Sequence, residues 1–207
     1  MTTSSTTTGA IEAQASPFQA LIFDLGGVLV AHDNGVLYER LASRCAGDCS
    51  PERVTALMRK TDWSSGVPIP ALHDQLRSEL GYGPGWEDFV ADWCCHFAID
   101  ESMLAFVERL AGHNRVMLFS NTNKEHWDFL LRATDGRLQR LEPYLSHEMG
   151  CTKPSLRSFE IVAEKAGVDP AREAAQSQRK GCRSSTPPSR LRRRKPRRRW
   201  QKLRPPT

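Results

Sequence analysis

The pattern of apolar and polar positions predicts an α/β fold with a helical insertion. Two short, uninterrupted apolar runs, 20–23 and 116–119, are typical of strands buried inside a parallel sheet. Between them, apolar residues recur at helical spacing through 34–99, which predicts about four helices. Later helices are expected to begin at Asp100 and Ser155 and to end at Gly112 and Gly167.

Small polar residues follow both apolar runs. Asp24 comes directly after the first run, and Ser120 and Asn121 come directly after the second. Ligands of open α/β sheets bind outside the carboxyl ends of the strands, so these side chains are expected to carry the chemistry. The alternative for Ser-Asn-Thr-Asn at 120–123 is an ordinary turn or helix cap.

The first of these segments resembles a known motif. Phe23-Asp24-Leu25-Gly26-Gly27-Val28-Leu29 is similar to the first motif of the haloacid-dehalogenase-like (HAD) superfamily, whose hydrolases use this aspartate as a nucleophile. The usual motif has a second aspartate two positions later as the general acid/base, and Gly26 stands there in this chain. The glycine form resembles the sugar-phosphate phosphatase subgroup, such as α-D-glucose-1-phosphate phosphatase.

Two later segments resemble further HAD motifs. Residues 116–123 are similar to the second motif, which implies that the Ser120 hydroxyl binds a phosphoryl oxygen and that Asn121 adds an amide donor. Residues 143–154 are similar to the third strand and third motif, in which a lysine precedes a proline; this implies a catalytic, phosphate-binding role for Lys153. Pro154 also disfavours a helical conformation at Lys153.

The resemblance implies a Rossmann-like core with a parallel sheet and a small helical cap inserted after the first strand. The core corresponds to 19–33 and 100–173, and the cap to 34–99. The cap would act as a lid; the alternative is that its helices only cover the sheet. Trp63, Trp86 and Trp93 are expected in the interior of the cap rather than as platforms for a sugar ring.

The implied function is hydrolysis of a phosphomonoester of a small phosphorylated metabolite through an aspartyl-phosphate intermediate. The resemblance implies Mg²⁺, held by the Asp24 carboxylate and the Gly26 backbone carbonyl. Two unit charges of like sign about 4 Å apart repel by about 4 kcal/mol at an effective dielectric constant near 20, so positive charge beside the phosphate is required. Lys153 would supply part of it.

The fourth HAD motif has no counterpart in this sequence. That motif is an apolar strand ending in one or two aspartates that complete the magnesium site, whereas no acidic residue and no apolar run follows Glu173. In the superfamily's strand order, three-two-one-four-five, this truncated sheet would leave the strand before Asp24 as an exposed apolar edge. We therefore expect impaired activity and a tendency to aggregate.

The charge is divided unevenly along the chain. Of the 29 Lys and Arg residues, 13 lie in 174–207, while all 24 acidic residues precede them, so residues 1–173 carry a formal net charge of −8. We interpret 1–18 as a disordered leader and 174–207 as a disordered basic tail. One hypothesis for the tail is nucleic-acid binding, which would make the chain a non-catalytic binding protein. The other, which we favour, is a shifted reading frame.

The cysteines indicate a cytoplasmic protein. They have neither a disulfide framework nor a zinc-site spacing, and we interpret them as ordinary thiols: Cys45, Cys49, Cys94, Cys95, Cys151 and Cys182. No run approaches the roughly 20 apolar residues that a membrane span requires. Cys151 and Arg157 have the Cys-x5-Arg spacing of thiol phosphatases, but Pro154 lacks an N–H group that such a loop needs, so we interpret the spacing as coincidence.

Overall fold

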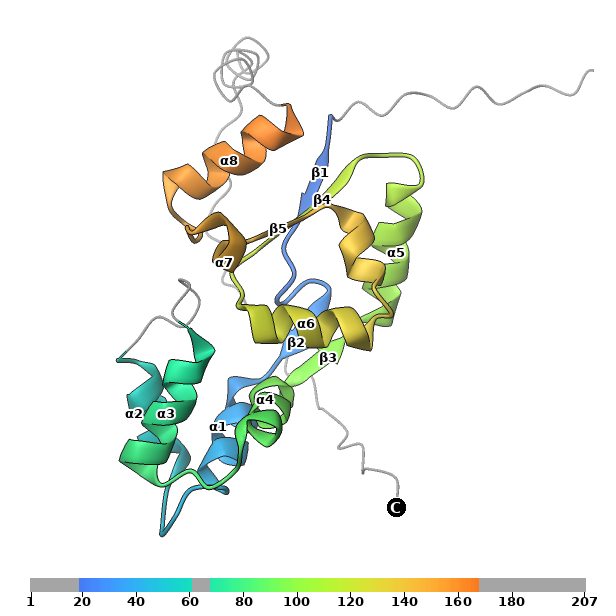
Figure 1. Cartoon of the computed structure of the whole chain (residues 1–207). Coiled ribbons are helices and arrows are strands. Elements are labelled where there is room, and N and C mark those ends of the chain that lie inside the picture. Colours follow the sequence, from blue (N-terminus) through green and yellow to red (C-terminus); the bar gives the residue numbers. More distant parts are fainter. Residues whose placement is uncertain (1–18, 61–67, 168–207) are drawn as a thin grey trace, which may run out of the picture. The chain divides into compact units, whose positions relative to one another are not determined.

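Among the described residues, three short strands form a parallel sheet (Figure 1). The computed structural model describes residues 19–60 and 68–167. The strands β1 (Leu21–Phe23), β4 (Val116–Ser120) and β5 (Pro143–Leu145) are arranged in the order β1-β4-β5, and both pairings are parallel. The α/β fold with a parallel sheet that the sequence predicts is therefore confirmed.

Helices cover both faces of the central strand β4, and its side chains on both faces are buried in apolar clusters. Val116 and Leu118 belong to one apolar cluster, which includes side chains of α5 (Glu101–Ala111) and α6 (Lys124–Ala133). Met117 and Phe119 belong to a second cluster with side chains of α8 (Leu156–Ala166). Successive residues of a strand point to opposite faces, so an uninterrupted apolar run is what a sheet buried on both sides requires.

The ends of the helices follow the expected capping rules. Asp100 accepts a hydrogen bond from the Met103 N–H and caps α5, and Ser155 caps α8 in the same way. Gly112 and Gly167 follow the last residues of these helices. Two shorter elements complete this part of the chain, the 3-10 helix η1 (Arg137–Leu141) and α7 (Ser146–Met149).

Four helices follow the first strand and pack around a core of their own (Figure 1). In the described part of this stretch they are α1 (Asn34–Ala42), α2 (Pro51–Met58), α3 (Ile69–Leu80) and α4 (Trp86–Cys94), where the sequence predicted about four helices. Trp93 is buried in this core, whereas Trp86 is 38% exposed. Trp63 lies outside the described residues. The assignment of 34–99 as a cap stays a prediction.

A two-stranded ribbon joins these four helices to the rest of the chain. Strand β2 (Val30–His32) pairs antiparallel with β3 (Phe97–Ile99), with Val30 opposite Ile99. Neither strand was predicted from the sequence, because three residues are too few to show an alternating pattern. The ribbon continues into its flanks, where the Asp100 N–H donates to the Leu29 carbonyl at 2.8 Å.

Strand β1 lies at the edge of the sheet that the structure describes. It hydrogen-bonds to β4 on one side, and Ile22 in its middle is 48% exposed. The expected apolar edge depends on a fourth strand being missing after Glu173, a part of the chain outside the described residues, and it stays a prediction. The expected leader 1–18 and the expected tail 174–207 lie outside the described residues. Within residues 19–60 and 68–167, no helix combines the length and the apolar character needed to cross a membrane.

We predict that Ile22 promotes self-association of the chain. In Ile22→Thr, the exposed edge keeps its backbone groups but loses apolar surface, so the dissociation constant of self-association should rise about fivefold, equivalent to about 1 kcal/mol. Sedimentation velocity over a concentration series measures the change. The matched control is Phe106→Thr on α5, where an equally exposed apolar residue lies on a helix. Equal effects of the two substitutions would contradict a role of the strand edge.

Candidate active site

Lys153 joins the ends of two strands. Its ammonium nitrogen lies 2.8 Å from Oδ2 of Asp24, which follows β1, and donates a hydrogen bond of 2.8 Å to the carbonyl of Phe119 in β4. The other carboxylate oxygen of Asp24 accepts a hydrogen bond from the Leu25 N–H at 2.8 Å. The Lys153 ammonium also lies 5.0 Å from the centre of the Phe119 ring. Asp24 and Lys153, which the sequence motifs indicate as site residues, therefore form an ion pair.

Parallel pairing explains why these groups meet. Phe23, the last residue of β1, pairs with Leu118 of β4, so Asp24 lies beside Phe119 at the carboxyl ends of both strands. Lys153 reaches this place from the segment between β5 and α8. The side chain of Asp24 is 47% exposed and that of Lys153 is 21% exposed, so the carboxylate is accessible to a ligand while the ammonium is largely enclosed.

Asn121 holds the backbone of Lys153. Its Oδ1 accepts a hydrogen bond from the Lys153 N–H at 2.8 Å, and its Nδ2 donates to the Lys153 carbonyl at 2.9 Å. The side-chain amide thus satisfies both backbone groups of one residue, as a neighbouring strand would. From the sequence, this amide was expected to bind phosphate. The observed partner instead makes Asn121 a positioning residue for Lys153, and its contact with phosphate stays a prediction.

Ser120 lies at the end of β4, one residue beyond the carbonyl that Lys153 binds. The residue is 3% exposed, and its hydroxyl makes no hydrogen bond within the described residues. The following turn is held by Ser146, whose Oγ accepts from the Thr122 N–H and donates to the Thr122 carbonyl, both at 2.9 Å. The Ser120 hydroxyl is therefore available to a ligand and sits on a firmly held segment.

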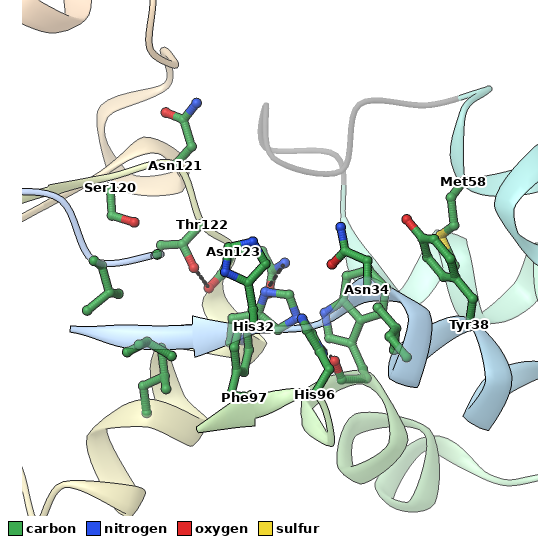
Figure 2. Close-up of a pocket in the computed structure, with 17 residues that line it drawn as sticks. His32, Asn34, Tyr38, Met58, His96, Phe97, Ser120, Asn121, Thr122 and Asn123 are labelled. Carbon is green, nitrogen blue, oxygen red and sulfur yellow. Dashed lines mark hydrogen bonds between the residues drawn. The ribbon is translucent and has the colours of Figure 1, made fainter. Parts of the chain in front are cut away.

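A pocket with a volume of about 450 Å³ opens beside these residues (Figure 2). Ser120 and Asn121 line one end, and Tyr38 of α1 and Met58 of α2 line the other. Asp24 and Lys153 are not wall residues, but the wall includes Leu25, which follows Asp24, and Asn121, which holds Lys153. The ion pair therefore lies next to the end of the pocket formed by the sheet.

His126 is a neutral wall residue with a defined tautomer. Oδ1 of Asn123 accepts from the His126 N–H and caps α6, so the Nδ2 of Asn123 must be the donor in its 3.2 Å contact with Nδ1 of His126. The proton of the ring is therefore on Nε2, which donates to the Trp93 carbonyl at 3.3 Å. The ring also stacks on that of Trp93, with centroids 4.8 Å apart. These contacts connect α6 to α4.

Burial keeps two imidazoles of this wall uncharged. It lowers the pKa of His126 to about 3 and the pKa of His96 to about 4, and in each case a neighbouring histidine adds to the effect. The two rings lie 5.5 Å apart. Neither residue was predicted from the sequence as part of the site. The only available signal was the Asn-x-x-His spacing at 123–126, which fits a helix cap with a histidine in its first turn.

Gly26 lies in the wall of the pocket and forms a bridge with Val30. Its role as a magnesium ligand through its carbonyl stays a prediction. In the part of the chain that the structure describes, no group of three or more His, Cys, Asp or Glu side chains is arranged to hold a metal ion. The role of Asp24 as a magnesium ligand likewise stays a prediction.

The cysteines have no arrangement that indicates catalysis. The five described ones are free thiols, and burial raises the pKa of Cys45 and of Cys94 to about 12. Thiols with raised pKa values are poor nucleophiles. Arg157 is 66% exposed and lies 3.7 Å from Glu160, so the Cys-x5-Arg spacing at Cys151 gains no support.

Solved structures show the same fold. No family model matches this chain, and no curated protein matches it. A HAD-family enzyme from Bacteroides thetaiotaomicron is 26% identical with a TM-score of 0.62, covering 73% of this chain and 79% of its own. A predicted HAD-like family hydrolase from Porphyromonas gingivalis is 20% identical with a TM-score of 0.62, covering 77% and 86%. The likeness to the Bacteroides enzyme supports the HAD superfamily, and the likeness to the Porphyromonas protein supports the fold.

The Bacteroides enzyme is also known with ligands. An aspartate-to-alanine mutant of it has been crystallised with magnesium and inorganic phosphate, and this structure is 25% identical to our chain with a TM-score of 0.61. A magnesium complex of the same enzyme is 26% identical with a TM-score of 0.59. The comparisons therefore support a HAD-like hydrolase, and the Bacteroides enzyme that it resembles has been crystallised with magnesium.

We predict that Asn121→Ala lowers the free energy of unfolding by about 1–3 kcal/mol, because both backbone groups of Lys153 lose their partner. Urea denaturation followed by circular dichroism measures the change. Asn114→Ala is the matched control, since the Asn114 amide makes one local hydrogen bond, to the Leu110 carbonyl, and should cost less than about 1 kcal/mol. If the two substitutions cost the same, Asn121 does not hold Lys153 as described.

We also predict a loss of stability in mild acid. The folded pKa values of His96 and His126 lie below the usual value near 6.5, so the unfolded chain takes up protons first as the pH falls. Stability is complete above about pH 6.5 and falls toward pH 4, by up to about 1.4 kcal/mol per pH unit for each imidazole.

Urea denaturation at pH 7, 6 and 5 measures this slope. His126→Phe removes one of the two groups and should flatten it, whereas His113→Gln, which changes an exposed histidine in the α5 to β4 connection, should leave it as it is. If the dependence of stability on pH is the same in the unaltered chain, His126→Phe and His113→Gln, His126 is not buried in its neutral form.

Proposed function

We propose that this chain is a HAD-type phosphatase that hydrolyses a phosphomonoester of a small phosphorylated metabolite through an aspartyl-phosphate intermediate. The observation that carries the proposal is the 2.8 Å ion pair between Lys153 and Asp24 at the carboxyl ends of β1 and β4, next to a pocket. A carboxylate that is held by one ammonium and one N–H group, and yet is about half exposed, is suited to attack an anionic phosphoryl group.

The named residues divide the work of the first step. Asp24 attacks phosphorus, and the Lys153 ammonium offsets the repulsion between the carboxylate and the phosphoryl oxygens, which is about 4 kcal/mol per charge pair at about 4 Å. The Ser120 hydroxyl donates a hydrogen bond to a phosphoryl oxygen. Asn121 keeps Lys153 in place through two hydrogen bonds. Catalysis of phosphoryl transfer consists mainly of such positioning and charge neutralisation.

The reaction balances with water as the co-substrate. A bond forms between a carboxylate oxygen of Asp24 and phosphorus, and the bond from phosphorus to the alcohol oxygen breaks with its electron pair on that oxygen. The alkoxide takes a proton from a water molecule, and the hydroxide that remains attacks phosphorus in the second step. The bond between phosphorus and the Asp24 oxygen breaks, phosphate leaves, and the Asp24 carboxylate is restored.

The oxygen donors at this end of the sheet suit Mg²⁺, but with so few of them the ion would bind weakly. Asp24 and the carbonyl of Gly26 would hold it, with water and phosphate oxygens completing its shell, since Mg²⁺ commonly keeps several waters. When bound, the ion would neutralise charge on the phosphoryl group. The magnesium and phosphate complexes of the Bacteroides enzyme support this. With one carboxylate for the metal and no acidic residue after Glu173, we expect low activity.

The pocket supports an uncharged alcohol as the leaving group. Among its described wall residues there is no Asp, Glu, Lys or Arg, and the imidazoles of His96 and His126 are uncharged. An ionised leaving group would lose its hydration there without gaining an opposite charge, which is costly. This favours the sugar-phosphate subgroup. The free thiols favour a reducing cytoplasm. No observation on the described residues favours nucleic-acid binding by the tail.

Substitution of the nucleophile tests the proposal. With Mg²⁺ present, Asp24→Asn should lower kcat for p-nitrophenyl phosphate by at least about 10³-fold, and Lys153→Met by about 10²-fold, because attack and charge neutralisation are lost separately. Asp128→Asn, an exposed carboxylate that pairs with Lys124 on α6, is the matched control and should retain activity. Removal of Mg²⁺ with EDTA should abolish turnover. Activity that survives in Asp24→Asn would refute the proposal.

A further inference from the structure

The imidazole of His32 faces the position where Gly26 has no side chain. A Cβ atom built on Gly26 would lie 3.6 Å from Cε1 and 3.7 Å from Nδ1 of His32, with no other atom as near. These are ordinary van der Waals distances. The ring of His32 therefore borders the space into which a side chain at position 26 would project.

Backbone hydrogen bonds fix the place of this ring. His32 is the last residue of β2 and pairs with Phe97 of β3. The next residue, Asp33, donates its N–H to the His96 carbonyl at 3.2 Å, and at the other end of the strand Val30 forms the bridge to Gly26. The ribbon is thus held on both sides of His32, and the ring is presented by an ordered strand rather than by a loop.

The ring has no competing partner. Neither nitrogen of His32 hydrogen-bonds to another of the described residues, and the residue is exposed although it lines the pocket. Its nearest aromatic neighbour is His96, whose ring centre lies 6.5 Å away in an edge contact. By contrast, both nitrogens of His126 are engaged. Unlike His126, His32 can therefore offer an N–H group to a ligand.

The pocket places His32 between the phosphate end and the far end. Figure 2 shows Ser120 and Asn121 at one end and Tyr38 and Met58 at the other, with His32 between them. If the phosphoryl group lies beside Asp24, Ser120 and Lys153, the alcohol extends toward Tyr38 and Met58. The oxygen that links the two parts then lies near the middle of the pocket, where His32 is.

We propose that the His32 imidazole donates a hydrogen bond to the leaving-group oxygen of the phosphomonoester and is a catalytic residue that replaces the side chain missing at Gly26. The inference rests on the proposed function. As the bond from phosphorus to oxygen breaks, its electron pair stays on the alcohol oxygen, and an N–H group aimed at that oxygen stabilises the growing charge. The alcohol takes its proton from water, so no further reactant is needed.

The dependence of the rate on the leaving group tests this role. p-Nitrophenolate spreads its charge over the ring and needs little help, whereas the alkoxide of glycerol 3-phosphate needs a donor. We expect His32→Leu to lower kcat/KM for glycerol 3-phosphate by roughly 10²-fold and that for p-nitrophenyl phosphate by less than about fivefold. His32→Gln keeps an N–H donor and should stay within about tenfold of the unaltered chain on both esters. His113→Leu is the control, with no change expected.

The outcomes separate the two proposals. Equal losses on the two esters, no loss on either, or a His32→Gln variant as impaired as His32→Leu would overturn the role of His32 while leaving the phosphatase in place. If the unaltered chain hydrolyses neither ester with Mg²⁺, both proposals fall. Circular dichroism and thermal unfolding identify a variant that does not fold, in which case His32→Gln, the closest in size and polarity, decides.

Discussion

The ammonium of Lys153 is the group on which the arrangement of the site depends. It contacts the carboxylate after β1, the Phe119 carbonyl and the Phe119 ring, while Asn121 fixes its backbone. A largely enclosed cation requires such partners, since an unpaired buried charge costs several kcal/mol. Asp24 does not depend on the pair to the same degree, because it is 47% exposed and water can solvate it. The ion pair is therefore a requirement of the lysine that also orients the carboxylate.

The position of Asp24 depends on a turn as much as on a strand. Strand β1 contributes three residues of pairing at the edge of the described sheet, which is a weak anchor. After Asp24, the carbonyl of Leu25 accepts hydrogen bonds from the N–H groups of Val28, Leu29 and Val30, and the side chains of Leu25 and Leu29 are buried. The carboxylate is thus held from β1 on one side and from this turn on the other, and the turn compensates for the short strand.

The sequence predicted the parts of the site that lie at the ends of recognisable elements. Asp24 and Ser120 follow uninterrupted apolar runs, and Lys153 precedes a proline, so local patterns reveal them. Asn121 could be predicted as a site residue but not as the partner of Lys153, because the two are 32 residues apart and only the tertiary fold brings them together.

The ribbon and its histidines could not be predicted in this way. β2 and β3 are three residues each, and their pairing links Val30 to Ile99 across the four helices. Single histidines carry no pattern in a sequence, so His32, His96 and His126 gave no signal of their own. The neutral state of His96 and His126 follows from their burial and, for His126, from its contact with Asn123. These are properties of the folded chain.

The absence of a side chain at Gly26 and the presence of His32 are aspects of one packing arrangement. The turn after Asp24 brings β2 back beside Gly26, and the bridge to Val30 holds the two backbones together. A longer side chain at position 26 would have to share its space with the imidazole, whose atoms begin 3.6 Å from the Cβ position. A glycine leaves that space to a ring carried by a neighbouring strand. A polar group can therefore occupy the same place in the pocket from a position eight residues after Asp24, although the motif itself no longer contains one.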